Sequence, residues 1–251
     1  MTATDDNPGE DREQPLIEHL IELRSRLLRS LLAVLVVFLA LSPFANTLYS
    51  AVATPLMQRL PAHAGMIATG VAAPFLVPFK LTVFVALFLS MPFLLYQLWA
   101  FVAPALYRNE KRFALPLLLS SVVLFYAGVA FAFYAVFPLL FRFFTSVAPA
   151  GVTVMTDIGQ YLDFILKMFF AFGMAFEIPI ATILLVSTGA ITVTSLERKR
   201  PYIIVGAFVA GMLLTPPDVL SQVMLAVPIW MLFELGLLFS RRFAPEDDGE
   251  E

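Results

Sequence analysis

The sequence has no cysteine and only two histidines, His19 and His63, which lie far apart in the chain. Without cysteine it can form neither a disulfide nor a thiolate metal site, and two distant histidines do not make a zinc-binding pattern. The sequence also lacks a Ser-His-Asp arrangement, a zinc-protease motif and a phosphate-binding glycine loop. We therefore expect no enzyme active site, no metal and no cofactor.

Charged residues are scarce, at 14% of the chain, whereas hydrophobic residues make up 60%. Together with a mean hydropathy of +0.86, this composition excludes an ordinary soluble domain. Ten of the nineteen acids lie near the two chain ends, which leaves nine acids against fifteen basic residues between residues 14 and 245. We predict disordered acidic tails at 1–14 and 243–251, a single membrane domain at 15–242, and no binding to nucleic acid.

Long apolar runs predict helices that cross a bilayer. The six expected spans lie at about residues 27–45, 75–103, 113–141, 161–188, 202–214 and 219–239. A bilayer core of about 30 Å needs about 20 helical residues, so the fifth and sixth spans are short and form a hairpin. Prolines inside the spans are Pro78, Pro92, Pro116, Pro138, Pro179 and Pro228. Because proline bends a helix, we predict an all-α polytopic membrane protein whose six bent, tilted helices form a concave, cupped surface.

The basic residues predict the orientation of these spans. Twelve of the sixteen fall before the first span, between the second and third, before the fifth, or after the sixth. All these positions lie on one side of the membrane, which the positive-inside rule makes cytoplasmic. Both chain ends are then cytoplasmic. Since the acidic N-terminus lacks the features of a signal peptide, the first apolar run should act as an uncleaved anchor.

A short stretch dense in both charge signs, residues 18–29, leads into the first span. Within it, Glu22 and Arg26 form an i,i+4 pair of favourable order. One interpretation is an amphipathic surface helix whose arginines set the topology. The other is that Glu22 is a docking carboxylate for a cationic partner at the membrane face. Glu110, in a basic loop after the second span, is either neutralised by neighbouring bases or completes a carboxylate pair that suits two guanidinium groups.

Glu177 lies near the middle of the fourth span, because the ten residues between it and Ser187 correspond to about 15 Å of helix. A carboxylate at that depth costs on the order of 2.5–3.5 kcal/mol, so a functional role is the expectation. The alternative is a protonated carboxyl satisfied by a neighbouring helix. Pro179 should also free the carbonyl of Ala175 and leave a polar notch beside Glu177.

Three further features have local structural explanations. Thr156 or Asp157 could cap the helix of the fourth span. Asp163 and Lys167, four residues apart, could form an ion pair on that helix. Asp218 follows two prolines and could cap the sixth span.

Four stretches resemble, in the same order, signatures of the TatC family, the receptor of twin-arginine protein translocation. The first reads HLIELRSRL at 19–27, and the second reads YQLWAFVAPALY at 96–107, followed by a Glu-Lys-Arg loop. The third reads AFGMAFEIP at 171–179, and the fourth runs from RKRPY at 198 to TPPD at 218. Together they extend over nearly the whole chain.

The resemblance implies a six-span receptor of the bacterial inner (plasma) membrane, shaped like a cupped hand, with both ends cytoplasmic. It would bind the twin-arginine signal peptides of folded precursors and take part in transport driven by the proton motive force. By motif position, Glu22 and Glu110 would contact the arginine pair of the signal. Arg24, Arg26 and Phe101 would lie in the same cytoplasmic patch.

The resemblance also implies contacts with other proteins. Glu177 would be the polar residue of the concave face that docks single-span partners of the TatA/TatB type, and the protein would self-associate within a larger complex in the lipid bilayer. Pro55 and Asp218 match positions in the outer-side cap. Ser25 departs from the pattern, since the family often has a basic residue there.

Two other classes of protein are alternatives to this interpretation. A proton-coupled secondary transporter could use Glu177 as a relay, but it predicts inverted repeats, and we find no convincing similarity between residues 16–141 and 155–240. A purely structural membrane scaffold would leave Glu177 as a satisfied interhelical acid. The four ordered motifs favour the receptor.

Overall fold

The structure, a computed structural model, describes residues 10–57, 66–106, 114–147, 156–214 and 219–242. Its helices, in chain order, are α1 (Glu10–Leu41), α2 (Ala45–Met57), α3 (Ala73–Leu106), α4 (Ala114–Phe131), α5 (Phe137–Val147), α6 (Ile158–Ala175), α7 (Ile178–Ser187), α8 (Val193–Arg198), α9 (Arg200–Leu214) and α10 (Val219–Ser240). A 3₁₀ turn at Ser42–Phe44 joins α1 to α2, and a π-helical turn at Ala132–Val136 joins α4 to α5. α1 begins at Glu10, so the helix starts before the end of the predicted acidic tail.

The predicted helical membrane fold is confirmed. Among the described residues, five helical segments are long and apolar enough to cross a membrane: His19–Val52, Ala73–Phe101, Leu115–Phe143, Ile158–Ser187 and Val219–Ser240. α9 is apolar but shorter. The described part of the chain adds to the helices two strands, β1 (Met66–Ile67) and β2 (Thr156–Asp157), which pair in parallel.

Two of the five long helical segments change or break close to a proline. The third segment changes from α4 through the π-helical turn to α5, whose second residue is Pro138. The fourth segment breaks at Phe176 and Glu177, between α6 and α7, and Pro179 is the second residue of α7. In contrast, α3 continues through Pro78 and Pro92. These changes therefore lie in the third and fourth of the five long segments.

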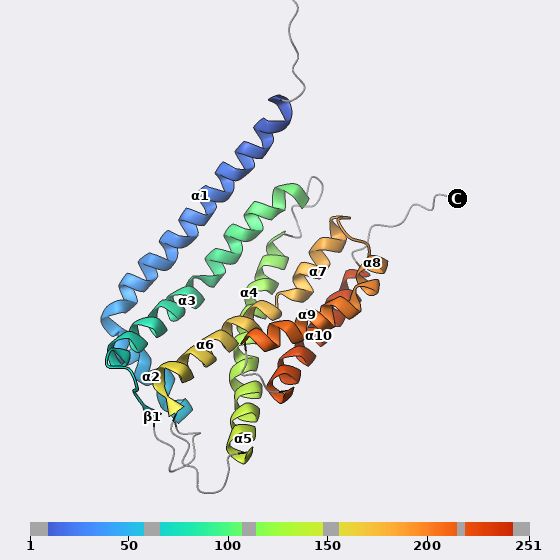
Figure 1. Cartoon of the computed structure of the whole chain (residues 1–251). Helices are drawn as coiled ribbons and strands as arrows, with labels where there is room; N and C mark the ends of the chain where they lie inside the picture. The colour runs from blue at the N-terminus through green and yellow to red at the C-terminus, as the bar shows by residue number, and fades with distance from the viewer. Residues whose placement is uncertain (1–9, 58–65, 107–113, 148–155, 215–218, 243–251) are drawn as a thin grey trace, which may run out of the picture.

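The helices form an open row rather than a closed ring (Figure 1). α1 packs on α3 at one edge, α3 packs on α4 and α6, and the α9–α10 pair packs on α7 at the other edge. The core lies in the middle of the row, where Phe125, Phe137, Leu140, Ile165 and Phe172 are at most 1% exposed. It therefore holds the α4–α6 crossing in place.

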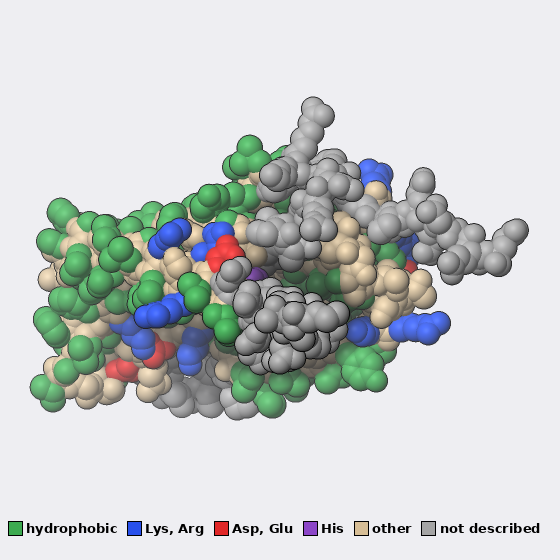
Figure 2. Space-filling model, turned by 90° about the horizontal axis from the view of Figure 1, so that it is seen from above, with side chains coloured by type: hydrophobic (Ala, Val, Ile, Leu, Met, Phe, Trp, Pro, Cys, Tyr) green, Lys and Arg blue, Asp and Glu red, His purple; other side chains and the backbone are tan. Residues whose placement is uncertain are grey.

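Helix α1 has a broad apolar surface that no described helix covers. Its outward leucines include Leu28, Leu31 and Leu39, which are 53%, 64% and 60% exposed. So much exposed leucine on one helix suits contact with lipid chains rather than water. Figure 2, viewed from the end where α1 begins, shows basic and acidic side chains gathered together, with hydrophobic side chains toward the edges.

Candidate functional site

The first candidate site lies where the start of α1 meets the end of α3. We call it the α1–α3 corner and define it by His19, Glu22, Arg26, Gln97 and Phe101. The predicted Glu22–Arg26 pair is confirmed: Nε and Nη2 of Arg26 donate to Oε1 of Glu22 at 2.9 and 2.6 Å. The same arginine donates through Nη1 to Oε1 of Gln97 at 3.2 Å, which ties α1 to α3.

An aromatic contact makes a second link across this corner. The rings of His19 and Phe101 are stacked, with centroids 4.3 Å apart and planes inclined by 23°. Phe101, which the family resemblance implies as a site residue, therefore lies within reach of the charged start of α1. The two predicted site residues Glu22 and Phe101 belong to the same corner although the sequence separates them widely.

Sequence reasoning missed Gln97. Its signal was a single amide inside the apolar run of the second span, where polar groups are kept only when they have partners. Its side chain is buried, at 6% exposed, and its carbonyl oxygen accepts from Arg26. Gln97 is thus part of the corner's polar network.

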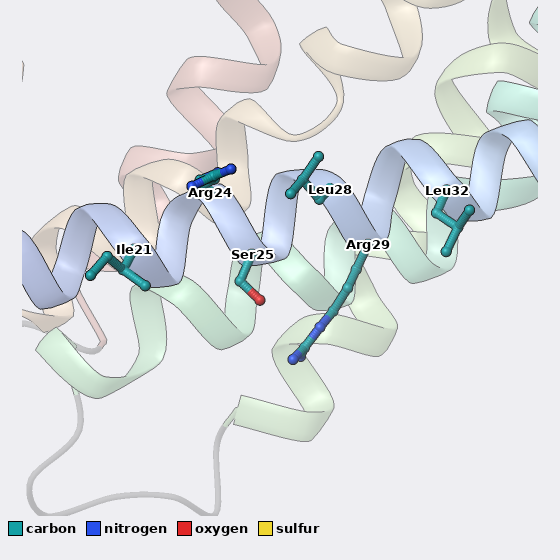
Figure 3. Close-up of a pocket in the computed structure, with 6 residues that line it drawn as sticks. All are labelled: Ile21, Arg24, Ser25, Leu28, Arg29 and Leu32. Atoms are coloured by element: carbon teal, nitrogen blue, oxygen red, sulfur yellow. The ribbon is translucent and has the colours of Figure 1, made fainter.

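Arg24 lies on another face of α1 from the Glu22–Arg26 pair, because two residues along a helix correspond to about 200° of rotation. Figure 3 shows it beside a shallow cavity of about 390 Å³. The residues that line this cavity are Ile21, Arg24, Ser25, Leu28, Arg29 and Leu32. The small side chain of Ser25 leaves space between its larger neighbours. The structure therefore separates Arg24 from Arg26, although the resemblance implies one patch.

The second candidate site surrounds Glu177, at the break between α6 and α7. Its backbone has left the regular helix, and Ser121 of α4 donates its hydroxyl to Oε2 of Glu177. Oε1 of Glu177 is buried and has no hydrogen-bond partner among the described residues. The predicted break before Pro179 is present, and it presents this carboxylate where α4 and α7 meet.

One local prediction is corrected. We expected Asp163 to pair with Lys167 along α6, but Asp163 forms its ion pair with Lys80 of α3. The reason is tertiary: α3 packs directly on α6, and Lys80 lies at the contact. Because this packing holds Lys80 beside Asp163, Asp163 pairs with Lys80 rather than with Lys167 on its own helix.

Near the start of α3, at the other end of that helix from the α1–α3 corner, Asp157 joins Thr69 and strand β2 to α6. Its Oδ1 accepts from the backbone N–H groups of Gly159 and Gln160, at 2.9 and 3.0 Å, which confirms the helix cap. Its Oδ2 accepts from the backbone and hydroxyl of Thr69, at 2.9 and 2.6 Å. These hydrogen bonds, led by that of the Thr69 hydroxyl, lower the pKa of Asp157 from 3.8 to about 2.

The structure describes no side-chain contacts for three of the predicted site residues. Glu110 and Asp218 lie outside the described residues. Pro55 falls within α2, but its side chain lies outside the described part of the chain.

The fold and these sites define a multi-pass membrane protein with one open carboxylate at a membrane end and another inside a span. A family model described as Sec-independent protein translocase protein (TatC) matches residues 18–228. The chain belongs to the TatC family. It is therefore a translocase component and not an enzyme.

Individual relatives agree over nearly the full length. The Sec-independent protein translocase protein TatC of Azotobacter chroococcum mcd 1 is 59% identical over 248 residues, 99% of this chain and 96% of the relative. Those of Haemophilus influenzae and Escherichia coli K12 are 60% and 55% identical over 238 residues, 95% of this chain and 93% and 92% of the relatives. A crystal structure titled twin arginine translocase receptor TatC matches with a TM-score of 0.81 and 36% identity, covering 90% of this chain and 99% of that chain.

Proposed function

We propose that this protein is the receptor of a twin-arginine translocase, which binds the signal peptides of folded precursors at the α1–α3 corner. The observation that carries the proposal is the pattern of hydrogen bonds at the carboxylate of Glu22. Arg26 occupies one of its carboxylate oxygens, and no described residue donates a hydrogen bond to the other, Oε2. Since carboxylates bind guanidinium groups well, the open oxygen suits an arginine from outside the protein.

The rest of the corner suits the residues around such an arginine. Phe101 stacks on His19, which lies one helical turn before Glu22 on α1, and guanidinium groups also stack on aromatic faces. A second carboxylate, Glu110, would meet the second arginine of the signal, and Arg24 would contribute from the other face of α1. The apolar surface of α1 and α3 would then guide the hydrophobic part of the signal into the bilayer.

Glu177 would serve a different partner. It places a half-buried carboxyl group inside a span, and a polar side chain on a second membrane helix could hydrogen-bond to that group there. We assign this position to single-span subunits of the TatA/TatB type, within a complex that contains further copies of this chain. Pro55 and Asp218 would belong to the cap at the opposite membrane face.

This proposal includes an orientation in the bacterial inner membrane. The α1–α3 corner would face the cytoplasm, together with both chain ends, as the distribution of basic residues predicts. The sequence has no nucleotide-binding loop, so transport would draw on another source of energy, and the family resemblance implies the proton motive force.

Site-specific crosslinking tests the assignment. A photo-reactive amino acid is placed at position 22, 110 or 177 in membranes that contain a labelled twin-arginine precursor. We expect positions 22 and 110 to crosslink to the signal peptide and position 177 to single-span subunits. A receptor for another ligand would give no precursor adduct at 22 or 110, and uptake of a small solute by the purified protein would instead indicate a transporter.

A further inference from the structure

The pair formed by Arg26 and Glu22 differs in geometry from the pair formed by Arg200 and Glu234. Arg200 donates through Nε to one oxygen of Glu234 and through Nη2 to the other, at 2.8 and 2.9 Å. This two-oxygen fork is frequent between arginine and carboxylate. Arg26 uses the same two nitrogens, but both converge on Oε1 of Glu22.

The two arginines also differ in a third contact, which Arg26 makes to Gln97. Its buried carbonyl oxygen accepts a hydrogen bond from Nη1 of Arg26 at 3.2 Å. The guanidinium group is planar and rigid, so fixing Nη1 on α3 also fixes the direction of Nε and Nη2. In the fork of Arg200, Glu234 receives the only side-chain hydrogen bonds that this arginine makes within the described residues. Arg26, which has the additional contact to Gln97, is thus also the arginine whose Nε and Nη2 both donate to a single carboxylate oxygen.

We propose that Gln97 is a positioning residue that keeps Oε2 of Glu22 available to the arginine of an incoming signal peptide. This inference rests on the proposed docking role of Glu22. With Gln97 present, Arg26 orients Glu22 through one oxygen and leaves the other open. Without Gln97, Arg26 turns to form the two-oxygen fork and occupies the position that the ligand's guanidinium would take. The protein's own arginine then competes with the signal.

The test measures binding of a synthetic twin-arginine signal peptide to the full-length protein in detergent. We expect Gln97→Leu to weaken binding about tenfold, the effect of closing one charge-assisted hydrogen-bonding position. Gln97→Glu restores an acceptor for Arg26 and should bind within about threefold of the unchanged protein. Gln160→Leu, at an exposed glutamine at the start of α6, is the matched control and should bind normally.

A double-mutant cycle separates positioning from a general effect on folding. If Gln97 acts by restraining Arg26, then Gln97→Leu should weaken binding no further once Arg26→Met is present. Equal losses in the two backgrounds, or unchanged binding in Gln97→Leu alone, would overturn the inference. If Gln97→Leu fails to fold, Gln97→Met, which has nearly the same length, takes its place in the cycle.

Glu22→Gln distinguishes this inference from the function on which it rests. If Glu22→Gln leaves binding intact, the docking role of Glu22 itself is wrong. If Glu22→Gln weakens binding as expected, but the cycle shows no coupling between Gln97 and Arg26, only the role of Gln97 is wrong.

Discussion

Four of the described carboxylates differ in how many of their oxygens have partners: two are open, with one unpartnered oxygen, and two are closed, with both oxygens partnered. Glu22 and Glu177 each use one oxygen within the protein, through Arg26 and Ser121, and leave the other without a partner among the described residues. Asp157 uses both oxygens, and Glu234 does the same with Arg200. The first two are the residues for which we propose binding roles, and the last two join elements of the fold. An acid with a spare oxygen can accept a ligand without first losing a structural contact.

The two open acids also differ from each other. Glu22 is held by a cation at a partly exposed position, so it suits a guanidinium group. Glu177 is held by a hydroxyl within a span, so it suits a hydrogen bond from a membrane helix more than a free cation. The same side chain thus serves two classes of partner because its surroundings differ.

The largest effect is expected at Glu22. Glu22→Gln removes the charge that would face the signal's arginine, and a hydrogen bond to a charged group contributes about 1.5–3 kcal/mol. We expect binding of a twin-arginine peptide to weaken by roughly 10- to 100-fold, measured by crosslinking or fluorescence titration. A twin-lysine peptide should bind the unchanged protein weakly. Full binding by the variant would show that the unpartnered oxygen of Glu22 does not bind the signal's arginine.

At Glu177 the expected effect is smaller and concerns a different partner. Glu177→Ala should leave signal binding intact but weaken association with single-span subunits by about 5- to 30-fold, because an interhelical hydrogen bond in a membrane contributes about 1–2 kcal/mol. Co-purification of the subunits measures this association. Ser121→Ala frees the second oxygen of Glu177 and is the milder companion variant. Loss of signal binding in Glu177→Ala would show that the two sites are not separate.

The variant Glu234→Gln tests the acids whose two oxygens both have partners within the protein. Glu234→Gln breaks the fork with Arg200, and since the side chains of Arg200 and Glu234 are 41% and 31% exposed, we expect only a small loss of thermal stability. Thermal unfolding in detergent measures the change. Signal binding should be unaffected, and a binding defect as large as that of Glu22→Gln would contradict the division into open and closed acids.

The smallest effect is expected at Asp157, and it depends on pH. Its pKa is lowered in the folded protein, from 3.8 to about 2, so its contribution to stability is complete above pH 3.8 and is lost as the pH falls toward 2. Asp157→Asn should flatten the pH dependence of thermal unfolding in that window. Thr69→Val removes the hydroxyl that contributes most to the shift and should flatten it partly. An unchanged pH profile in both variants would show that the hydrogen bonds of Asp157 do not stabilise the fold.

Apolar run lengths already predicted the helices, because a bilayer demands about 20 apolar residues for each span and leaves few alternatives. The break at Glu177 was predictable for the same kind of local reason, since Pro179 cannot donate to the carbonyl one turn back. The Glu22–Arg26 pair and the cap by Asp157 followed from spacings of three or four residues. Each of these features depends on neighbours in the chain.

The sequence by itself thus determined the class of protein, the helices and the acids with the strongest functional expectation. Only the tertiary structure decided which partner each acid has. Lys80 replaces Lys167 beside Asp163, Ser121 reaches Glu177 from another helix, and Gln97 reaches Arg26 from α3. The physical reason is that these partners are 56 to 83 positions away in the chain, and helix packing, which no local spacing encodes, brings them within hydrogen-bonding distance.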